Sequence, residues 1–151
     1  MSGVFNAPHE KVRQRLAIIG CGSSGLITLK YAQDLLPDWE IQCFEASGEI
    51  TGCWGDPYPG FVSTSTKFTT QFACFPKYSA NTSSASRCEK NEFFQGDEYG
   101  QYLLDFADHF QLKQHIRLHT RVEQIGSVGQ GDQWRLSLVE NLGDTNHDST
   151  E

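Results

Sequence analysis

Two periods of apolar residues near the start of the chain predict a strand, a helix and a second strand. Leu16–Ile19 is an unbroken apolar run, which is typical of a strand buried on both faces. From Ser23 to about Leu36 apolar residues recur at helical spacing, and Pro37 marks the end of this helix. Glu40–Phe44 then resembles a second short strand. This order predicts adjacent parallel strands joined by a helix.

The last third of the chain predicts another helix and three extended segments. Asp97–Phe110 has aromatic and apolar residues at helical spacing, and its first residue can cap the helix. Ile116–Thr120 alternates, and we assign it to the parallel sheet as its third strand. Val122–Ile125 continues extended, a break follows at Gly126–Gly131, and Trp134–Val139 alternates again. The expected fold class is α/β: a three-layer, Rossmann-like nucleotide-binding domain with a parallel sheet and a small antiparallel β-meander.

Between these parts lies a long stretch, Ala46–Gly96, with little periodicity and several prolines. A loop of this length inside a compact domain is unusual unless it is functional or disordered. Its many aromatic residues indicate ordered packing at least as far as Tyr78. We therefore expect this stretch to lie over a ligand.

Length and composition limit the possible classes of protein. The 151 residues fit one domain, expected at residues 15–140, with an N-terminal extension at 1–14 and a tail or truncated linker at 141–151. A net charge of −7 without a basic block argues against a nucleic-acid partner. No apolar run reaches the length of a signal peptide or a membrane span, so we expect a cytoplasmic protein.

The cysteines and histidines do not form a recognisable metal site. The five cysteines are odd in number and contain no C-x-x-C pair, which argues against a disulfide framework and a zinc site. His109, His115 and His119 have no cysteine or carboxylate at ligand spacing, so we interpret them as surface residues. We expect no metal.

The most informative segment is the turn between the first strand and the first helix. Gly20-Cys21-Gly22-Ser23-Ser24-Gly25 has the spacing G-x-G-x-x-G. Gly20 permits a tight turn, Gly22 leaves room for a diphosphate, and Gly25 lets the helix pack close to the strand. The helix N-terminus then presents unpaired N–H groups to an anion. The turn is a candidate site for the diphosphate of a dinucleotide.

An acidic residue ends the second strand, as a dinucleotide site requires. Glu45 lies 20 positions after Gly25, where a carboxylate accepts hydrogen bonds from the adenosine ribose and repels a 2′-phosphate. This position favours FAD or NAD over NADP as the first nucleotide. The alternative is a glycine-rich loop in an ordinary α/β domain, with Glu45 solvated at the end of a strand.

Three motifs in order resemble a known family. The runs IIGCGSSGL, CFEASGEITGCW and YPG are similar to the N-terminal FAD domain of flavin-containing monooxygenases and of the related Baeyer–Villiger monooxygenases. The family's G-G-x-W-like element corresponds to Thr51-Gly52-Cys53-Trp54, with threonine in place of the first glycine. The resemblance extends from about Leu16 to Leu138. It implies FAD and NADPH as cofactors.

The resemblance also implies roles for individual residues. It assigns the six residues of the glycine turn to the diphosphate, Glu45 to the ribose, and Cys53 with Trp54 to the flavin end of the cofactor. Val122 would contact the adenine through its backbone. For Trp54, a simple core aromatic is the alternative.

One departure from the family concerns the reactive edge of the flavin. Thr64, followed by Ser65, stands where the monooxygenases have asparagine or aspartate. A hydroxyl lacks the paired donor and acceptor of an amide, so the departure questions oxygen chemistry but not FAD binding. Both residues are counted as cofactor contacts, and Thr64 is the one candidate for a direct catalytic role. Nearby Lys67 either positions the phosphates of a second nucleotide or is solvated.

The resemblance implies an NADPH- and O2-dependent enzyme that oxygenates a nucleophilic nitrogen or sulfur of a small molecule. It also implies an NADPH-binding domain with its own glycine motif, yet the G-x-G-x-x-G at Gly20 has no second copy here, so we expect a truncated chain. Two alternatives stay open. One is a Baeyer–Villiger enzyme or another flavin oxidoreductase, and the other is an inactive or non-catalytic nucleotide-binding module.

Overall fold

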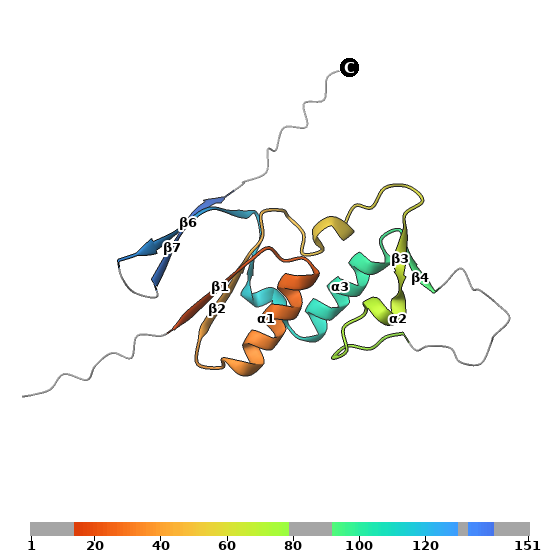
Figure 1. Ribbon diagram of the computed structural model, residues 1–151, viewed down its shortest axis with the longest axis horizontal. Coiled ribbons are helices and arrows are strands. Elements are labelled where there is room, and N and C mark those ends of the chain that lie inside the picture. The colour runs from red at the N-terminus through yellow and green to blue at the C-terminus, as the bar shows by residue number, and fades with distance from the viewer. Residues whose placement is uncertain (1–13, 79–91, 130–132, 141–151) are drawn as a thin grey trace, which may run out of the picture.

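A three-stranded parallel sheet lies at the centre of the protein. The computed structural model describes residues 14–78, 92–129 and 133–140. Strands β1 (Arg15–Ile19), β2 (Glu40–Phe44) and β5 (Ile116–Arg117) pair in the order β1-β2-β5. Figure 1 shows α1 (Ser23–Leu35) and α3 (Glu98–His109) beside this sheet. The expected α/β class with a parallel sheet is confirmed.

The two long helices supply most of the core. In α1 the apolar stripe Leu26, Leu29 and Ala32 is buried, and the helix ends at Leu35, because Pro37 disfavours helical backbone at the residue before it. The buried face of α3 is largely aromatic and packs on the same core. Its buried residues are Tyr99, Gly100, Tyr102, Leu103, Phe106 and Ala107.

Two details of the sheet differ from the expectation. β1 is not buried on both faces: Ile18 is buried, but the side chain of Ile19 is 50% exposed, because no described segment covers the face that it shares with Ala17. The third strand is also shorter than Ile116–Thr120. It ends at Arg117, since His119 adopts a left-handed φ of 53° and turns the chain away from β2.

The stretch 46–96 contains more regular structure than its sequence predicts. It forms η1 (Gly52–Trp54), and then β3 (Val62–Thr66) pairs with β4 (Phe93–Gln95) in a separate antiparallel sheet, with α2 (Lys67–Thr70) between them. β3 is largely polar and β4 is only three residues long, so neither shows the apolar alternation that identifies a half-buried strand.

The aromatic residues of this stretch are ordered, as expected, and most pack on α3. Phe72 and Phe75 contact Phe106 with ring centroids 4.7 and 5.7 Å apart. The hydroxyl of Tyr102 accepts a hydrogen bond from the Phe72 N–H (2.7 Å) and donates one to the Phe75 carbonyl (3.0 Å). This hydroxyl therefore anchors the irregular chain to α3. Two aromatics of the stretch remain largely exposed, Tyr58 and Phe68.

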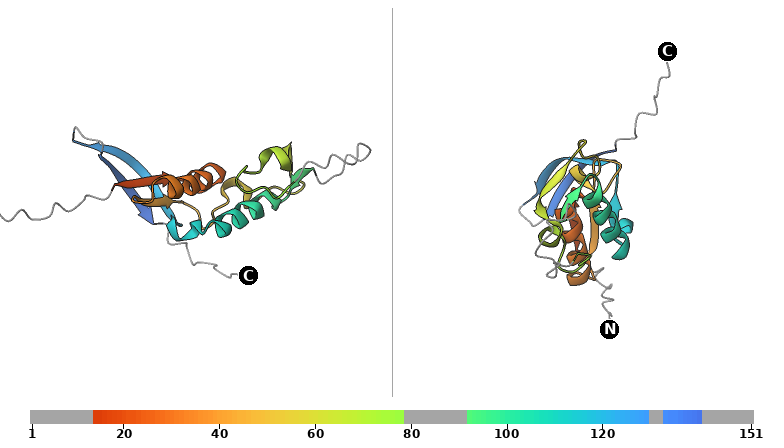
Figure 2. Two further views of the ribbon diagram at one scale, coloured as in Figure 1. Left: turned by 90° about the horizontal axis from the view of Figure 1, so that it is seen from below. Right: turned by 90° about the vertical axis from the view of Figure 1, so that its right-hand side faces the viewer.

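The expected meander is a long two-stranded ribbon. The 3₁₀ helix η2 (Leu112–His115) leads from α3 into β5, and β6 (Thr120–Val128) then pairs antiparallel with β7 (Gln133–Glu140). β6 continues through Gly126 and ends at Val128, inside the break expected at Gly126–Gly131. Figure 2 shows the ribbon and the β3–β4 sheet at opposite ends of an elongated molecule.

Parts of the expected layout fall outside the described residues. The N-terminal extension, except for Gln14, and the tail at 141–151 are among them, so these domain boundaries stay predictions. Within the described residues, no helix has both the length and the apolar character needed to cross a bilayer.

Candidate functional site

The glycine turn has the tight geometry that its spacing predicts. Gly20 has φ +88°, a value that favours glycine, and its N–H donates to the Phe44 carbonyl at 2.8 Å. A Cβ on Gly25 would lie 2.0 Å from the Gly20 carbonyl oxygen. Only glycine therefore fits at position 25, where α1 passes the end of β1.

The N-terminus of α1 is open to an anion. Gly22 is the N-cap residue, no side chain caps the helix, and the first turn contains no acidic residue. The first intrahelical bond runs from the Leu26 N–H to the Gly22 carbonyl. The preceding N–H groups, including those of Ser23 and Ser24, are those a helix leaves unpaired, so they could hold a diphosphate.

Glu45 faces this turn rather than bulk solvent. Its Oε2 accepts a hydrogen bond from the Cys21 N–H at 2.7 Å, and its Oε1 accepts from the N–H and the hydroxyl of Ser47 at 2.8 and 3.0 Å. Its backbone is also held, because the Thr120 N–H donates to the Glu45 carbonyl at 2.7 Å. The carboxylate thus lies between the glycine turn and the chain that leaves β5.

The charge of Glu45 is stabilised by these donors. Burial by itself raises the pKa of this carboxyl, but hydrogen bonds from the Ser47 backbone, the Cys21 backbone, the Ser47 hydroxyl and the Ala46 backbone outweigh it and leave the pKa below its ordinary value. A carboxylate oxygen has about two lone-pair sites, so Oε1 is filled by its two donors, whereas Oε2 accepts one hydrogen bond and can still accept a sugar hydroxyl.

Cys21 contributes a buried side chain to the glycine turn. Its side chain is fully buried, and a hydrogen bond with Cys43, followed by burial, raises the pKa of its thiol. A neutral, buried thiol is unreactive and fills space. Its N–H already donates to Glu45, so Cys21 contributes to the site through its backbone and its packing.

Cys53 and Trp54 lie near the glycine turn because Gly52, which precedes them, contacts it. A Cβ on Gly52 would lie 3.3 Å from the Gly22 Cα, so η1 contacts the glycine turn directly. Cys53 is exposed. Trp54 packs edge-on against Tyr99 and Phe61, with ring centroids 4.8 and 5.7 Å away. It is half-buried, so both the flavin role and the core role stay open for it.

The remaining predicted residues lie apart from the turn. Thr64 and Ser65 are exposed on β3, on the far side of η1 from the turn (Figure 1), and the Ser65 hydroxyl pairs with that of Thr70 at 2.6 Å. Val122 lies in β6, paired with Leu138 and two residues beyond the Thr120 that contacts Glu45. The structure thus brings together the glycine turn, Glu45 and η1, but not these three residues.

Lys67 is not solvated. It is only 9% exposed, its ammonium forms an ion pair with Glu98 at 2.9 Å, and the rings of Tyr78 and Phe94 lie within 6 Å. The interpretation of Lys67 as a solvated side chain is therefore wrong. In the described structure it joins α2 to α3.

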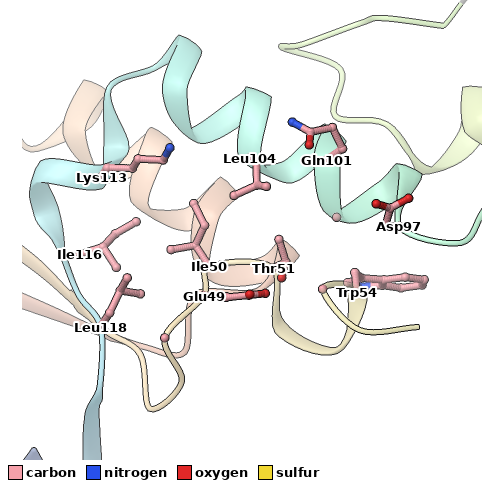
Figure 3. Close-up of a pocket in the computed structure, with 13 residues that line it drawn as sticks. Glu49, Ile50, Thr51, Trp54, Asp97, Gln101, Leu104, Lys113, Ile116 and Leu118 are labelled. Atoms are coloured by element: carbon pink, nitrogen blue, oxygen red, sulfur yellow. The ribbon is translucent and has the colours of Figure 1, made fainter. Parts of the chain in front are cut away.

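A pocket of about 430 Å³ lies beside the glycine turn, between the 48–55 loop, α3 and the start of β5 (Figure 3). Of the predicted site residues, Trp54 alone lines it. Its floor is apolar, and its rim carries charged and amide side chains. Besides three glycines, the residues that line the pocket are Glu49, Ile50, Thr51, Trp54, Asp97, Gln101, Leu104, Lys113, Ile116 and Leu118.

Sequence reasoning missed two features of this pocket. Thr51 is 3% exposed, and its hydroxyl has no hydrogen-bond partner among the described residues. Gly100 permits the close approach of α3, because a Cβ there would lie 2.5 Å from the Trp54 carbonyl oxygen. A glycine inside a helical pattern was the available signal for such an approach.

No metal site is found where the structure is described: no group of three or more potential ligands among histidine, cysteine and acidic residues could hold a metal ion there. His115 is half-buried, with Nδ1 3.3 Å from the Ile41 carbonyl, and His119 packs against Gly48. Both imidazoles thus have structural contacts in the described part of the chain.

Comparison with known proteins identifies the class. The family described as flavin-binding monooxygenase-like matches residues 13–145, so the chain belongs to this family. Among the similar curated proteins, a Penicillium crustosum protein called monooxygenase PC-14 is 32% identical over 122 residues, covering 78% of this chain and 20% of the relative. A Baeyer–Villiger monooxygenase of Streptomyces coelicolor is 29% identical over 139 residues, covering 88% and 24%.

The fold of this family is also found among solved structures. The crystal structure of OTEMO in complex with FAD and NADP superposes with a TM-score of 0.65 at 19% identity, over 84% of this chain and 22% of the other. The described fold is therefore that of part of a larger type of protein. The chain spans about a fifth of the length of the first of these curated relatives.

Proposed function

We propose that this chain binds FAD and forms the N-terminal, adenosine-binding part of an NADPH- and O2-dependent flavin monooxygenase. The observation that supports it most directly is the Glu45 carboxylate held against the N–H of Cys21 at the glycine turn. A diphosphate at the turn and a ribose at the carboxylate would then be neighbours, as in a dinucleotide. The FAD and NADP in the OTEMO structure agree with this assignment.

The residues at the turn fit FAD in shape and charge. Gly25 has no space for a side chain, Gly22 presents bare backbone, and the first turn of α1 offers unpaired N–H groups. Glu45 provides a carboxylate kept ionised by its donors. A 2′-phosphate at this position would meet that negative charge, so NADPH belongs to another site.

When bound, FAD would supply the redox and oxygen-activating chemistry, with NADPH as the reductant and O2 as the oxygen source. This chain would bind and orient FAD: the turn and the N-terminus of α1 hold the diphosphate, and Glu45 accepts the ribose hydroxyls. Cys53 and Trp54 would lie toward the flavin, and Val122 against the adenine. Thr64, with Ser65, would donate a hydroxyl hydrogen bond near the reactive edge. A nitrogen or sulfur nucleophile is the proposed substrate class.

A comparison of FAD with FMN tests the proposal. FMN lacks the adenosine half that the turn and Glu45 would bind, so the purified chain is expected to bind FAD at least about tenfold more tightly, a difference of about 1.4 kcal/mol. Quenching of flavin fluorescence measures both affinities. Equal affinities, or no binding of FAD, would leave the inactive-module alternative.

The reaction is tested on the full reading frame, because the chain covers a fifth of its relatives. NADPH consumption and product analysis with N,N-dimethylaniline and with cyclohexanone distinguish the two reaction types. An N-oxide supports the proposal, whereas a lactone from the ketone would assign the protein to the Baeyer–Villiger type.

A further inference from the structure

Apart from Trp54, the pocket beside the glycine turn is lined by residues outside the proposed FAD site. None of Gly20–Gly25 or Glu45 borders it. One wall is the loop from Gly48 to Gly55, and the opposite wall is the face of α3 that carries Gln101 and Leu104 (Figure 3). The same loop contacts the turn at Gly52, so it separates the two sites.

Two oxygen atoms converge on one side of this pocket. A Cβ on Gly55 would lie 2.3 Å from the Thr51 hydroxyl oxygen and 2.6 Å from Glu49 Oε2. Figure 3 shows the Thr51 hydroxyl beside the Glu49 carboxylate. The Thr51 hydroxyl is buried and has no partner among the described residues, an arrangement that is unfavourable when no water or ligand completes it. An N–H or O–H donor in the pocket would satisfy this oxygen.

The charge at the rim favours a cation. The carboxylates of Glu49 and Asp97 form no ion pair within the described part of the chain, and Asp97 does not cap α3 through its side chain. Lys113 also borders the pocket, but its ammonium pairs with Asp108 at 2.6 Å. The uncompensated charge at the rim is therefore negative.

The rest of the lining suits an apolar body. Ile50, Leu104, Ile116 and Leu118 form the floor, and the Trp54 indole stands at one end. Aromatic faces and unpaired carboxylates together attract organic cations. A volume of about 430 Å³ is in the usual range for small-molecule sites.

We propose that this pocket binds a small organic ammonium ion, with its apolar part on the floor and its N–H donors toward Thr51, Glu49 and Asp97. The site is distinct from the turn that would hold FAD, and its occupant is not the flavin. Binding therefore requires neither cofactor.

The probe is 2-phenylethylammonium, compared with neutral 2-phenylethanol and anionic phenylacetate. Backbone amide shifts in the ¹H–¹⁵N spectrum of the ¹⁵N-labelled chain are expected to change saturably at Gly48–Gly55 and at Gly100–Leu104. Affinity should decrease from the ammonium to the alcohol to the carboxylate. Changes centred on Gly20–Gly25, an order that does not follow charge, or no saturable change at millimolar concentrations would overturn the proposal.

Substitutions of the charged residues at the rim of the pocket test their effect on ammonium binding. Asp97→Asn and Glu49→Gln should each weaken ammonium binding about two- to fivefold, as expected for exposed charge pairs, and leave the alcohol unchanged. Lys113→Gln should strengthen it by a similar factor. The matched control is Asp38→Asn, which removes an exposed carboxylate that does not line the pocket.

Thr51→Val tests the buried hydroxyl with nearly the same volume. It should weaken both the ammonium and the alcohol, because each donates to this oxygen. If the spectrum shows that this variant does not fold, Glu49→Gln and Lys113→Gln test the proposal instead, because they should change the ammonium affinity in opposite directions. Equal affinities in these two variants would contradict the proposal.

Discussion

The Glu45 carboxylate accepts a hydrogen bond from the Cys21 N–H at 2.7 Å, which joins the end of β2 to the turn after β1. The two residues are 24 positions apart in the sequence and come from adjacent parallel strands. Because strand ends of a parallel sheet meet at one edge, this contact depends on the sheet register, in which Ile19 lies opposite Phe44. Glu45 is thus more than a solvated residue at the end of a strand.

Glu45→Gln should weaken FAD binding about tenfold. Both oxygens accept from N–H or O–H donors, and an amide would direct its NH2 group at one of these donors while losing the charge. Fluorescence titration with FAD measures the effect. Glu40→Gln at the opposite end of β2 is the control and should keep the wild-type affinity. An unchanged affinity in the Glu45 variant would show that the ribose does not use this carboxylate.

The sequence predicted the parallel sheet and the turn because both depend on local patterns. Apolar runs, Pro37 and the glycine spacing are sufficient to locate β1, α1 and β2. The exposed face of Ile19 could not be predicted, because an apolar run gives the same signal whether one face or two are covered. Whether the second face of the strand is covered depends on segments elsewhere in the chain.

The pocket escaped prediction for a related reason. The convergence of Thr51 and Glu49 on Gly55, and of Gly100 on Trp54, depends on how an irregular loop meets α3. The loop has no regular sequence period, and Trp54 and Gly100 are far apart in the sequence. The burial of Lys67 likewise follows from its pairing with Glu98, 31 positions later.

Gly25→Ala should destabilise the fold by about 3 kcal/mol, at the upper end of overpacking effects. Its Cβ would lie 2.0 Å from the Gly20 carbonyl oxygen, a backbone atom that cannot move without opening the turn. Urea unfolding measures the free energy. Gly126→Ala is the matched control, because a Cβ there meets no atom within 4 Å, and it should change stability by no more than about 0.5 kcal/mol. Equal effects of the two changes would contradict the close packing at Gly25.

Tyr102→Phe should cost about 2 kcal/mol, because it leaves the partly buried Phe72 N–H and Phe75 carbonyl without their partner. Tyr58→Phe, at an exposed position, should cost almost nothing.

The same residue predicts a change of stability in alkali. Burial raises the pKa of Tyr102 to about 12, above its ordinary value of 10. The neutral phenol therefore contributes its full stability below pH 10, and this contribution is lost as the pH rises from about 10 through 12. Unfolding free energies measured across this range should fall less steeply in Tyr102→Phe than in the wild type. Parallel curves would contradict the prediction.

The ion pair between Lys67 and Glu98 should respond unequally to the loss of either partner. Glu98→Gln leaves the buried ammonium without its counter-charge and should cost about 1–2 kcal/mol at pH 7, a moderate value because the Glu98 side chain is 44% exposed. Lys67→Met should cost less, since the carboxylate that it leaves is open to water. Urea unfolding of the two variants measures this difference, and a larger cost for Lys67→Met would contradict it.

Acid should remove the contribution of Glu98. Burial by itself raises the pKa of this carboxyl, but the hydrogen bond from Lys67, the Gln95 N–H and the Lys67 charge together lower it below its ordinary value of 4.5. The pair therefore stabilises the fold above pH 4.5, and this contribution is lost as the pH falls below that value. The stability difference between the wild type and Glu98→Gln should decrease from pH 5 to pH 3, measured by urea unfolding at each pH. A difference that stays constant would show that Glu98 acts through packing rather than through its charge.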